Sequence, residues 1–307
     1  MKHHIGCSGW SYDGWIGPFY PQHLENQYWL SYYSQIFSFV EIDSTFYKIP
    51  SKFMVSNWNK RTSQDFKFTV KFPKILTHEY SSKTVMTELE ETLSVFMDAM
   101  KPLRKKILAF IIQFPPWLKI MEGMDYLRTL ENFLDNSFRY AVEVRHSSWF
   151  NDMAYHFLKD RNFCLVWSQQ DRLVTPPIKT SDFLYLRLIG DRSISEKDFG
   201  KIVKDRKNDL INWSNILKDF EKNDTELKMT IVSANNHYAG FGPMTAKIFA
   251  EAVNDKEALK DNFPILDYTK PSLIEHSSDF DKSKYEGYES DKKRKTRQSF
   301  LSEFFDQ

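Results

Sequence analysis

The chain has 307 residues, of which 41% are hydrophobic and 16% aromatic, and its formal net charge is +1. This composition supplies a large apolar core, and the near-zero charge excludes a general attraction to nucleic acid, so any such attraction must be local. Two cysteines are too few for a disulfide framework and predict buried thiols in a cytoplasmic protein, or a nuclear one in a eukaryotic host. The chain opens on MKHHIGCSGW and has no long apolar run, so we expect neither a signal peptide nor a membrane span.

Hydrophobic periodicity predicts strands and helices that alternate along the chain. In chain order we expect strand 3–7, helix 28–37, strand 37–44, helix 50–61, strand 66–72, helix 88–100, strand 107–114, helix 126–134, strand 140–149, helix 151–159, strand 163–169, strand 182–190, helix 210–220, strand 228–235 and helix 244–253. Alternating strands and helices favour a parallel sheet, and eight such units match an α/β TIM-type (β/α)8 barrel over residues 1–255. A doubly wound open sheet is the main alternative. No glycine-rich dinucleotide or phosphate loop follows a strand, so we expect no nucleotide cofactor.

Several expected strands carry charges on one face. In residues 140–149, Val142 and Val144 share an apolar face, and Glu143 and Arg145 share the other. A strand covered by helices is ordinarily apolar on both faces. These charges therefore either pair inside the barrel or line a functional site.

The carboxyl ends of the strands are where a TIM barrel places its site. We predict Glu41, Asp43, Glu143 and His146 as catalytic residues, with Glu41, Asp43 and Glu143 as ligands of Mg²⁺ or Mn²⁺. Arginine grips phosphate with two donors. The predicted phosphate- or substrate-binding residues are Lys71, Arg145, Arg187, Asn235, Asn236 and Trp10.

Three other interpretations of the same residues stay open. The charges can form a balanced network that fills the barrel, since buried charges must be paired. The barrel can bind a phosphorylated ligand without turnover, or Glu41 and Glu143 can serve as the paired carboxylates of a glycosidase. A three-zinc site is not favoured, because only His78, His146 and His237 of the eight histidines lie near the expected barrel mouth.

Seven short segments carry a distinctive pattern. They are GCSGWSYDGWIGPFYP at 6–21, FVEIDSTFYKIPS at 39–51, FKFTVKFPKILTH at 66–78, IIQFPP at 111–116, AVEVRHSSW at 141–149, YLRLIG at 185–190 and ANNHYAGFGPMTA at 234–246. The pattern resembles the YecE-like family, domain of unknown function number seventy-two. The resemblance implies a TIM-type barrel but supplies no reaction. The family tends to carry an acid near the end of strand six, whereas this chain reads SQQD with Asp171 later.

The composition of the chain changes towards its C-terminus. We expect a polar linker over residues 256–291, with no strand or helix period from Tyr268 onward. Residues 292–307 then hold a basic run and a short aromatic motif. The basic run, which suits electrostatic contact with DNA phosphates, consists of Lys292, Lys293, Arg294, Lys295 and Arg297.

The aromatic motif is formed by Gln298, Leu301, Phe304 and Phe305. It resembles the PCNA-interacting peptide, or PIP box, which binds DNA sliding clamps. One helical turn would bring Leu301, Phe304 and Phe305 together as an apolar plug for a groove on the partner. The competing interpretation is a last amphipathic turn that docks on this chain's own barrel.

Together these features predict a PCNA-associated replication or repair protein with DNA as a partner and no membrane contact. The PIP box points to an archaeal or eukaryotic host. The expected activity is a metal-assisted nuclease or other phosphodiesterase. The alternatives are a non-catalytic adaptor that binds DNA or a phosphate ligand, and a carbohydrate-active barrel.

Overall fold

The computed structural model describes residues 2–79 and 86–254. The predicted linker, basic run and PIP box lie outside the described residues and stay predictions. In the part of the chain that is described, no helix has the length and apolar character that a membrane crossing requires.

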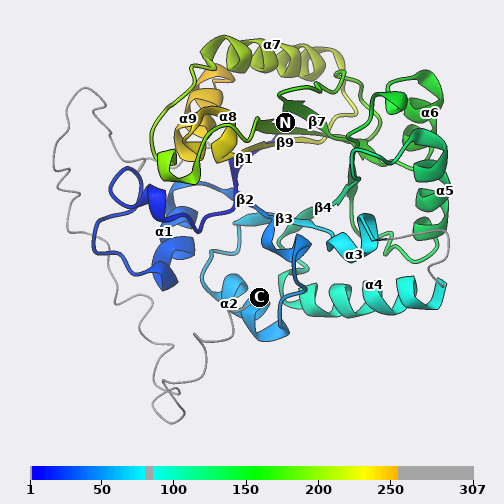
Figure 1. The fold of residues 1–307 in the computed structure, drawn as a ribbon, viewed down its shortest axis with the longest axis horizontal. Coiled ribbons are helices and arrows are strands. Elements are labelled where there is room, and N and C mark those ends of the chain that lie inside the picture. The colour runs from blue at the N-terminus through cyan, green and yellow to red at the C-terminus, as the bar shows by residue number, and fades with distance from the viewer. Residues whose placement is uncertain (1, 80–85, 255–307) are drawn as a thin grey trace. The chain divides into compact units, whose positions relative to one another are not determined.

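Parallel strands form the centre of the fold (Figure 1). They run in the order β6-β5-β4-β3-β2-β1-β9-β8-β7, and each pairing between neighbours is parallel. Their bounds are β1 Lys2–Ser8, β2 Phe39–Ile42, β3 Lys67–Lys71, β4 Ile107–Gln113, β5 Tyr140–Glu143, β6 Cys164–Leu165, β7 Trp167–Gln170, β8 Phe183–Gly190 and β9 Met229–Ala234. The predicted TIM-type α/β barrel is confirmed.

Strands β6 and β7 are two pieces of the single strand expected at 163–169, with Val166 between them. Strand β6 pairs with β5, whereas β7 pairs with β8. The backbone N–H of Val166 still donates to Val142 O at 2.9 Å. The chain therefore changes partner at Val166, and this change nearly closes the sheet into a barrel.

Helices surround the strands (Figure 1). Their bounds are α1 Trp29–Ile36, α2 Lys52–Lys60, α3 Lys74–Thr77, α4 Met86–Met100, α5 Ile120–Glu131, α6 Asp152–Asp160, α7 Lys207–Asn223, α8 Asn236–Ala239 and α9 Gly242–Ala252. Among the strands, β5 ends at Glu143, six residues before the expected end at 149. Among the helices, the main difference from expectation is α5, which begins six residues before the expected start at 126. Gly123 weakens the helical pattern there, and it is needed because a Cβ at that position would lie 2.2 Å from Trp149 Cζ2.

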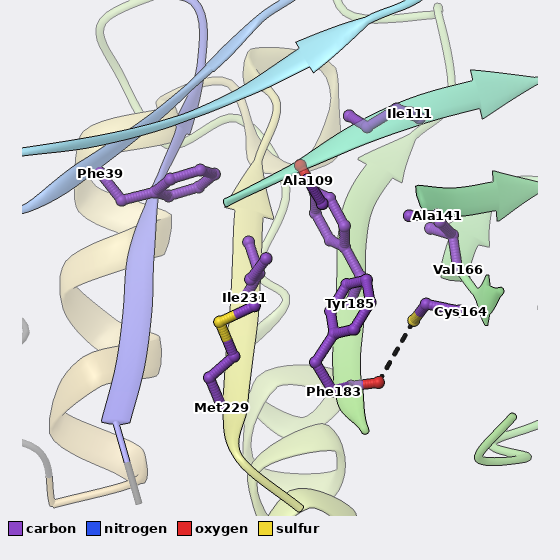
Figure 2. Packing of buried hydrophobic residues seen from close by; sticks show 10 residues of the cluster. All are labelled: Phe39, Ala109, Ile111, Ala141, Cys164, Val166, Phe183, Tyr185, Met229 and Ile231. Atoms are coloured by element: carbon purple, nitrogen blue, oxygen red, sulfur yellow. Dashed lines mark hydrogen bonds between the residues drawn. The ribbon is translucent and has the colours of Figure 1, made fainter. Parts of the chain in front are cut away.

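The interior of the barrel is apolar towards the amino ends of its strands (Figure 2). Side chains from several strands fill it, namely Phe39, Ala109, Ile111, Ala141, Cys164, Val166, Phe183, Tyr185, Met229 and Ile231. Two residues further along their strands, Phe39, Ala141 and Tyr185 are followed by Glu41, Glu143 and Arg187. Because side chains alternate along a strand, these three charges point into the same interior, above the apolar layer.

Candidate functional site

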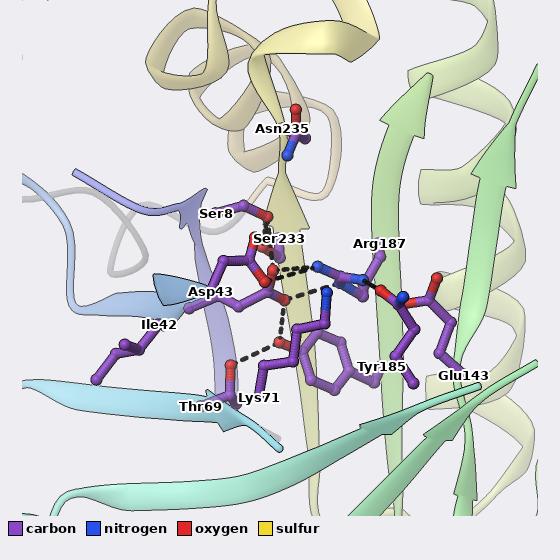
Figure 3. A network of polar contacts seen from close by, with 12 residues as sticks. Ser8, Ile42, Asp43, Thr69, Lys71, Glu143, Tyr185, Arg187, Ser233 and Asn235 are labelled. Atoms are coloured by element: carbon purple, nitrogen blue, oxygen red, sulfur yellow. Dashed lines mark hydrogen bonds and ion pairs between the residues drawn. The ribbon is translucent and has the colours of Figure 1, made fainter. Parts of the chain in front are cut away.

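Arg187 lies at the centre of the polar layer in the barrel mouth (Figure 3). Its side chain is only 3% exposed and forms ion pairs with Glu41, Asp43 and Glu143. The Nε–H donates to Glu41 Oε2 at 2.9 Å, and one terminal nitrogen donates to Asp43 Oδ1 at 3.2 Å. The other terminal nitrogen donates to Glu143 Oε2. One guanidinium from β8 thus joins Glu41 within β2, Asp43 directly after β2 and Glu143 at the end of β5.

Glu41 is fully buried and is held by both of its carboxylate oxygens. Ser8 donates to Oε1 at 2.7 Å, and Tyr185 donates its phenolic hydrogen to Oε2 at 2.6 Å. Arg187 donates to both oxygens. Ser8 ends β1, and Tyr185 and Arg187 lie two residues apart on β8, so strand register fixes the position of the carboxylate. The hydroxyls of Ser233 and Thr69 extend this network, at 2.9 Å from Ser8 and 2.6 Å from Tyr185.

Glu143 ends β5 and is also fully buried. Arg145 Nε donates to Glu143 Oε1 at 2.9 Å, and an Arg145 terminal nitrogen donates to Gln113 Oε1 at 3.0 Å. The side chain of Arg145 is 20% exposed. Arg145 therefore forms the solvent side of the cluster, whereas Arg187 forms its buried side.

The three carboxylates experience different electrostatic environments. Burial by itself would raise the pKa of Glu143, but the charges of Arg187 and Arg145 outweigh it and hold that pKa at about 2. Arg187 lowers the pKa of Glu41 against the same effect of burial. The pKa of Asp43 moves the other way, to about 6, because of burial and the negative charge of Glu41. Asp43 is thus the acid of this cluster that titrates near neutral pH.

Lys71 ends β3 beside this cluster, and its side chain points towards the carboxylates (Figure 3). The residue is 8% exposed, and its Nζ lies 3.9 Å from the centroid of the Phe46 ring. Burial lowers the pKa of Lys71 to about 8, partly opposed by the negative charge of Asp43. His78 packs edge-on against the same ring, and burial followed by the charges of Lys71 and Arg145 lowers its pKa to about 4.

The structure brings six of the predicted residues together: Glu41, Asp43, Glu143, Lys71, Arg145 and Arg187. The other four have local contacts. Trp10 packs edge-on against Trp58 with ring centroids 5.7 Å apart. His146 Nδ1 lies 2.9 Å from Ser148 Oγ.

Asn235 and Asn236 follow β9 and hold the backbone of the loop. Asn235 accepts a hydrogen bond from the backbone N–H of His237 at 3.0 Å and caps α8. Asn236 accepts from Trp15 Nε1 at 3.0 Å and from the backbone N–H of Gly242 at 2.9 Å. The binding roles predicted for both residues stay predictions.

Tyr185 and Ser233 belong to the network but were not among the candidates from the sequence. Tyr185 precedes Arg187 by two residues, so strand alternation places both on the interior face. Ser233 lies on β9 and precedes Asn235, which follows that strand, by two residues. The alternation was therefore a usable signal for Tyr185, although a tyrosine in an apolar run is more often part of a core.

The oxygens of Glu41 and Glu143 bear on the predicted metal site. All four accept hydrogen bonds from within the chain. A divalent ion between these glutamates would have to displace Arg187, so this donor arrangement does not fit Mg²⁺ or Mn²⁺. No group of three or more His, Cys, Asp or Glu placed to hold a metal occurs among residues 2–79 and 86–254. The metal ligands expected from the sequence stay a prediction.

Comparisons with other proteins show which family the chain resembles. The family called Protein of unknown function DUF72 matches residues 4–266. The UPF0759 protein YecE of Escherichia coli (strain K12) is 29% identical over 150 residues, which are 48% of this chain and 50% of YecE. The UPF0759 protein YunF of Bacillus subtilis (strain 168) is 30% identical over 155 residues, which are 50% of this chain and 54% of YunF. The chain spans about half the length of these curated relatives.

Solved structures of related proteins share the fold. The crystal structure of a DUF72 family protein from Thermotoga maritima superposes with a TM-score of 0.70 and 27% identity, covering 83% of this chain and 100% of that one. A DUF72 family protein from Enterococcus faecalis gives a TM-score of 0.69 at 21% identity, covering 86% and 100%. The resemblance to the YecE-like family is confirmed by the match over residues 4–266, and the chain belongs to the DUF72 family.

Proposed function

We propose that this chain is a phosphodiesterase that acts on DNA and is recruited by a PCNA-type sliding clamp. The observation that carries the proposal is the position of Arg145 and Lys71. Arg187 pairs with the buried acids, Arg145 pairs with Glu143 at the solvent side, and Lys71 lies beside the cluster. They are suited to hold the anionic phosphate of a substrate at the barrel mouth.

Asp43 supplies the proton transfer that phosphodiester hydrolysis needs. Its side chain is 27% exposed, and its pKa of about 6 lies close to the pH of a cell. A carboxylate of this kind can accept a proton from an attacking water. The pairing of a tuned acid with neighbouring cations supports an enzyme more than a passive filling of the barrel.

The PIP box supports recruitment to DNA. Gln298, Leu301, Phe304 and Phe305 keep the spacing of a clamp-binding peptide, and the basic run at 292–297 precedes them. A single helical turn over these residues would form an apolar plug suited to a groove on a partner protein.

A nuclease assay tests the proposed activity. Single-stranded, double-stranded, nicked and flapped DNA would be incubated with the full chain, with Mg²⁺, with Mn²⁺ and with a chelator. We expect Asp43→Asn to slow cleavage by about 100-fold or more, the ordinary contribution of a general base. The matched control is Asp98→Asn, an exposed carboxylate paired with Lys52 and Lys101 outside the barrel mouth. Absence of cleavage by the unmodified chain on every substrate would overturn the proposal.

A non-catalytic adaptor is the second candidate. It is favoured by the complete internal bonding of Glu41 and Glu143, which suits a rigid binding site. Inorganic phosphate that raises the melting temperature, without any turnover of DNA, would support this function. A glycosidase is less well supported, since its general acid needs a raised pKa and the pKa values of both glutamates are lowered.

A further inference from the structure

Two buried lysines of the barrel have opposite surroundings. The Lys106 ammonium is 3% exposed and donates to Asn59 O at 2.7 Å, Thr62 O at 3.0 Å and Thr62 Oγ1 at 3.0 Å. Within residues 2–79 and 86–254, the Lys71 Nζ has neither a hydrogen-bond acceptor nor a carboxylate oxygen at ion-pair distance. Its nearest defined contact is the face of Phe46. Lys106 is held as a structural cation, whereas the Lys71 amine is not.

This environment enlarges the neutral share of the Lys71 amine, while the ammonium form still predominates near pH 7. Burial penalises the ammonium ion, and the positive charges of Arg187 and Arg145 add to the effect, while Asp43 and Glu143 oppose it. With a pKa of about 8 in place of 10.5, the neutral fraction near pH 7 is about 300-fold larger than for an ordinary lysine. A neutral amine at an enzyme site is a nucleophile for carbonyl carbon.

We propose that Lys71 forms a covalent imine with the aldehyde of an abasic site in DNA and that the chain cleaves the strand there by β-elimination. This inference rests on the proposed function for the choice of DNA. Intact DNA contains no aldehyde, and a deoxyribose that has lost its base opens to one at C1′. Arg145 keeps its role as the cation that holds the phosphate.

The reaction balances without an oxidant or reductant. The neutral Lys71 amine adds to C1′, and the adduct takes up one proton from solvent as it loses water, which gives a protonated imine. The Asp43 carboxylate then takes a proton from C2′, and the electron pair of that bond expels the 3′ phosphate by breaking the C3′–O bond. Water finally hydrolyses the imine, which frees the lysine and leaves an unsaturated aldehyde on one fragment and a 5′ phosphate on the other.

Borohydride trapping tests the imine. The full chain would be incubated with a duplex oligonucleotide containing one abasic site, reduced with borohydride, and analysed by intact mass and peptide mapping. We expect a covalent adduct on Lys71 in the unmodified chain, and its loss in Lys71→Arg, which keeps the charge. The matched control is Lys74→Arg, since Lys74 follows β3 by three residues and is 50% exposed. That variant should trap as much DNA as the unmodified chain.

The outcomes separate this inference from the proposed function. An adduct that maps to any other lysine or to the terminal amine would overturn the inference about Lys71. This mapping uses the unmodified chain, so it does not depend on the folding of a variant. A second outcome is cleavage of DNA that has no abasic site, with no trapped adduct on abasic DNA. It would support a hydrolytic phosphodiesterase and contradict the lysine mechanism. An adduct on Lys71 together with no cleavage of intact DNA would support the inference and rule out a phosphodiesterase that hydrolyses intact DNA.

Discussion

Replacing Arg187 by methionine would leave Glu41 and Glu143 buried without the cation that they share. Breaking a buried ion pair by removing one partner costs about 3–5 kcal/mol, because an uncompensated charge remains. We expect Arg187→Met to lower the free energy of unfolding by this amount, as measured with urea at pH 7. The control Arg104→Met removes an exposed pair with Asp135 and should cost less than about 1 kcal/mol. A similar loss in both variants would contradict the central role of Arg187.

The pH dependence of stability should follow Glu143. Its folded-state pKa is about 2, below the ordinary value of 4.5. A group of this kind stabilises the folded chain fully above pH 4.5, and this stabilisation is lost as pH falls towards 2. Arg187→Met removes the cation that lowers the pKa of Glu143. The free energies of unfolding of the variant and of the unmodified chain should therefore converge as pH falls below about 4.5. A gap that stays constant down to pH 3 would argue against these ion pairs.

The contribution of Asp43 to stability should depend on pH in the opposite sense to that of Glu143. Its pKa of about 6 exceeds the ordinary 3.8, so the folded chain favours the protonated form and loses this contribution as pH rises through 6. We expect Asp43→Asn to raise the free energy of unfolding by about 1–2 kcal/mol at pH 7.5 and to change it little at pH 4. Unfolding by urea at the two pH values measures this. Greater stability combined with slower DNA cleavage would identify a site that exchanges stability for activity.

The sequence predicted which residues share the barrel mouth better than it predicted their partners. Strand alternation was enough to place Glu41, Glu143 and Arg187 on interior faces, because the period of two is a local property. Their pairing was not predictable. It depends on strand register between segments 44 and 146 residues apart in the chain, and register is set by the packing of the whole barrel. The different environments of Lys71 and Lys106 have the same origin.

At the scale of single elements, α5 shows how packing can override local propensity. Gly123 lowers the intrinsic helicity of residues 120–131, yet Trp149 packs against its bare backbone. Gly123→Ala should gain about 1 kcal/mol from helix propensity and lose more from the clash with the indole, for a net loss of about 1–2 kcal/mol. Thermal unfolding measures the change. Met121→Ala on the exposed face of the same helix should stay within about 0.5 kcal/mol.

The division of the expected strand into β6 and β7 could not be predicted from the sequence, for a related reason. An apolar run such as residues 163–169 reads as one buried strand, because the pattern reports burial and not the neighbour that each residue pairs with. The change from β5 to β8 at Val166 is a requirement of closing the barrel. The number of strands therefore differed from expectation while the architecture did not.

At the scale of the whole molecule, the family match and the proposed PIP box occupy separate parts of the sequence. The match ends at residue 266, whereas the motif begins at Gln298. A barrel activity and a clamp-binding activity that reside in separate segments should be separable by substitution. We therefore expect Phe304→Ala with Phe305→Ala to weaken binding to a PCNA-type clamp without changing barrel stability or cleavage of free oligonucleotides.

Calorimetric titration of the full chain into the sliding clamp measures this separation. The matched control is Phe300→Ala, which removes a tail aromatic from a position where the motif has no requirement. Loss of two of the three apolar side chains of the plug should weaken binding by about 100-fold or more, since buried aromatic anchors each carry about 2 kcal/mol or more of interface energy. Equal weakening by Phe300→Ala would show that the tail binds through general hydrophobicity. No binding by the unmodified chain would remove the clamp from the proposed function and leave the barrel chemistry to be tested on its own.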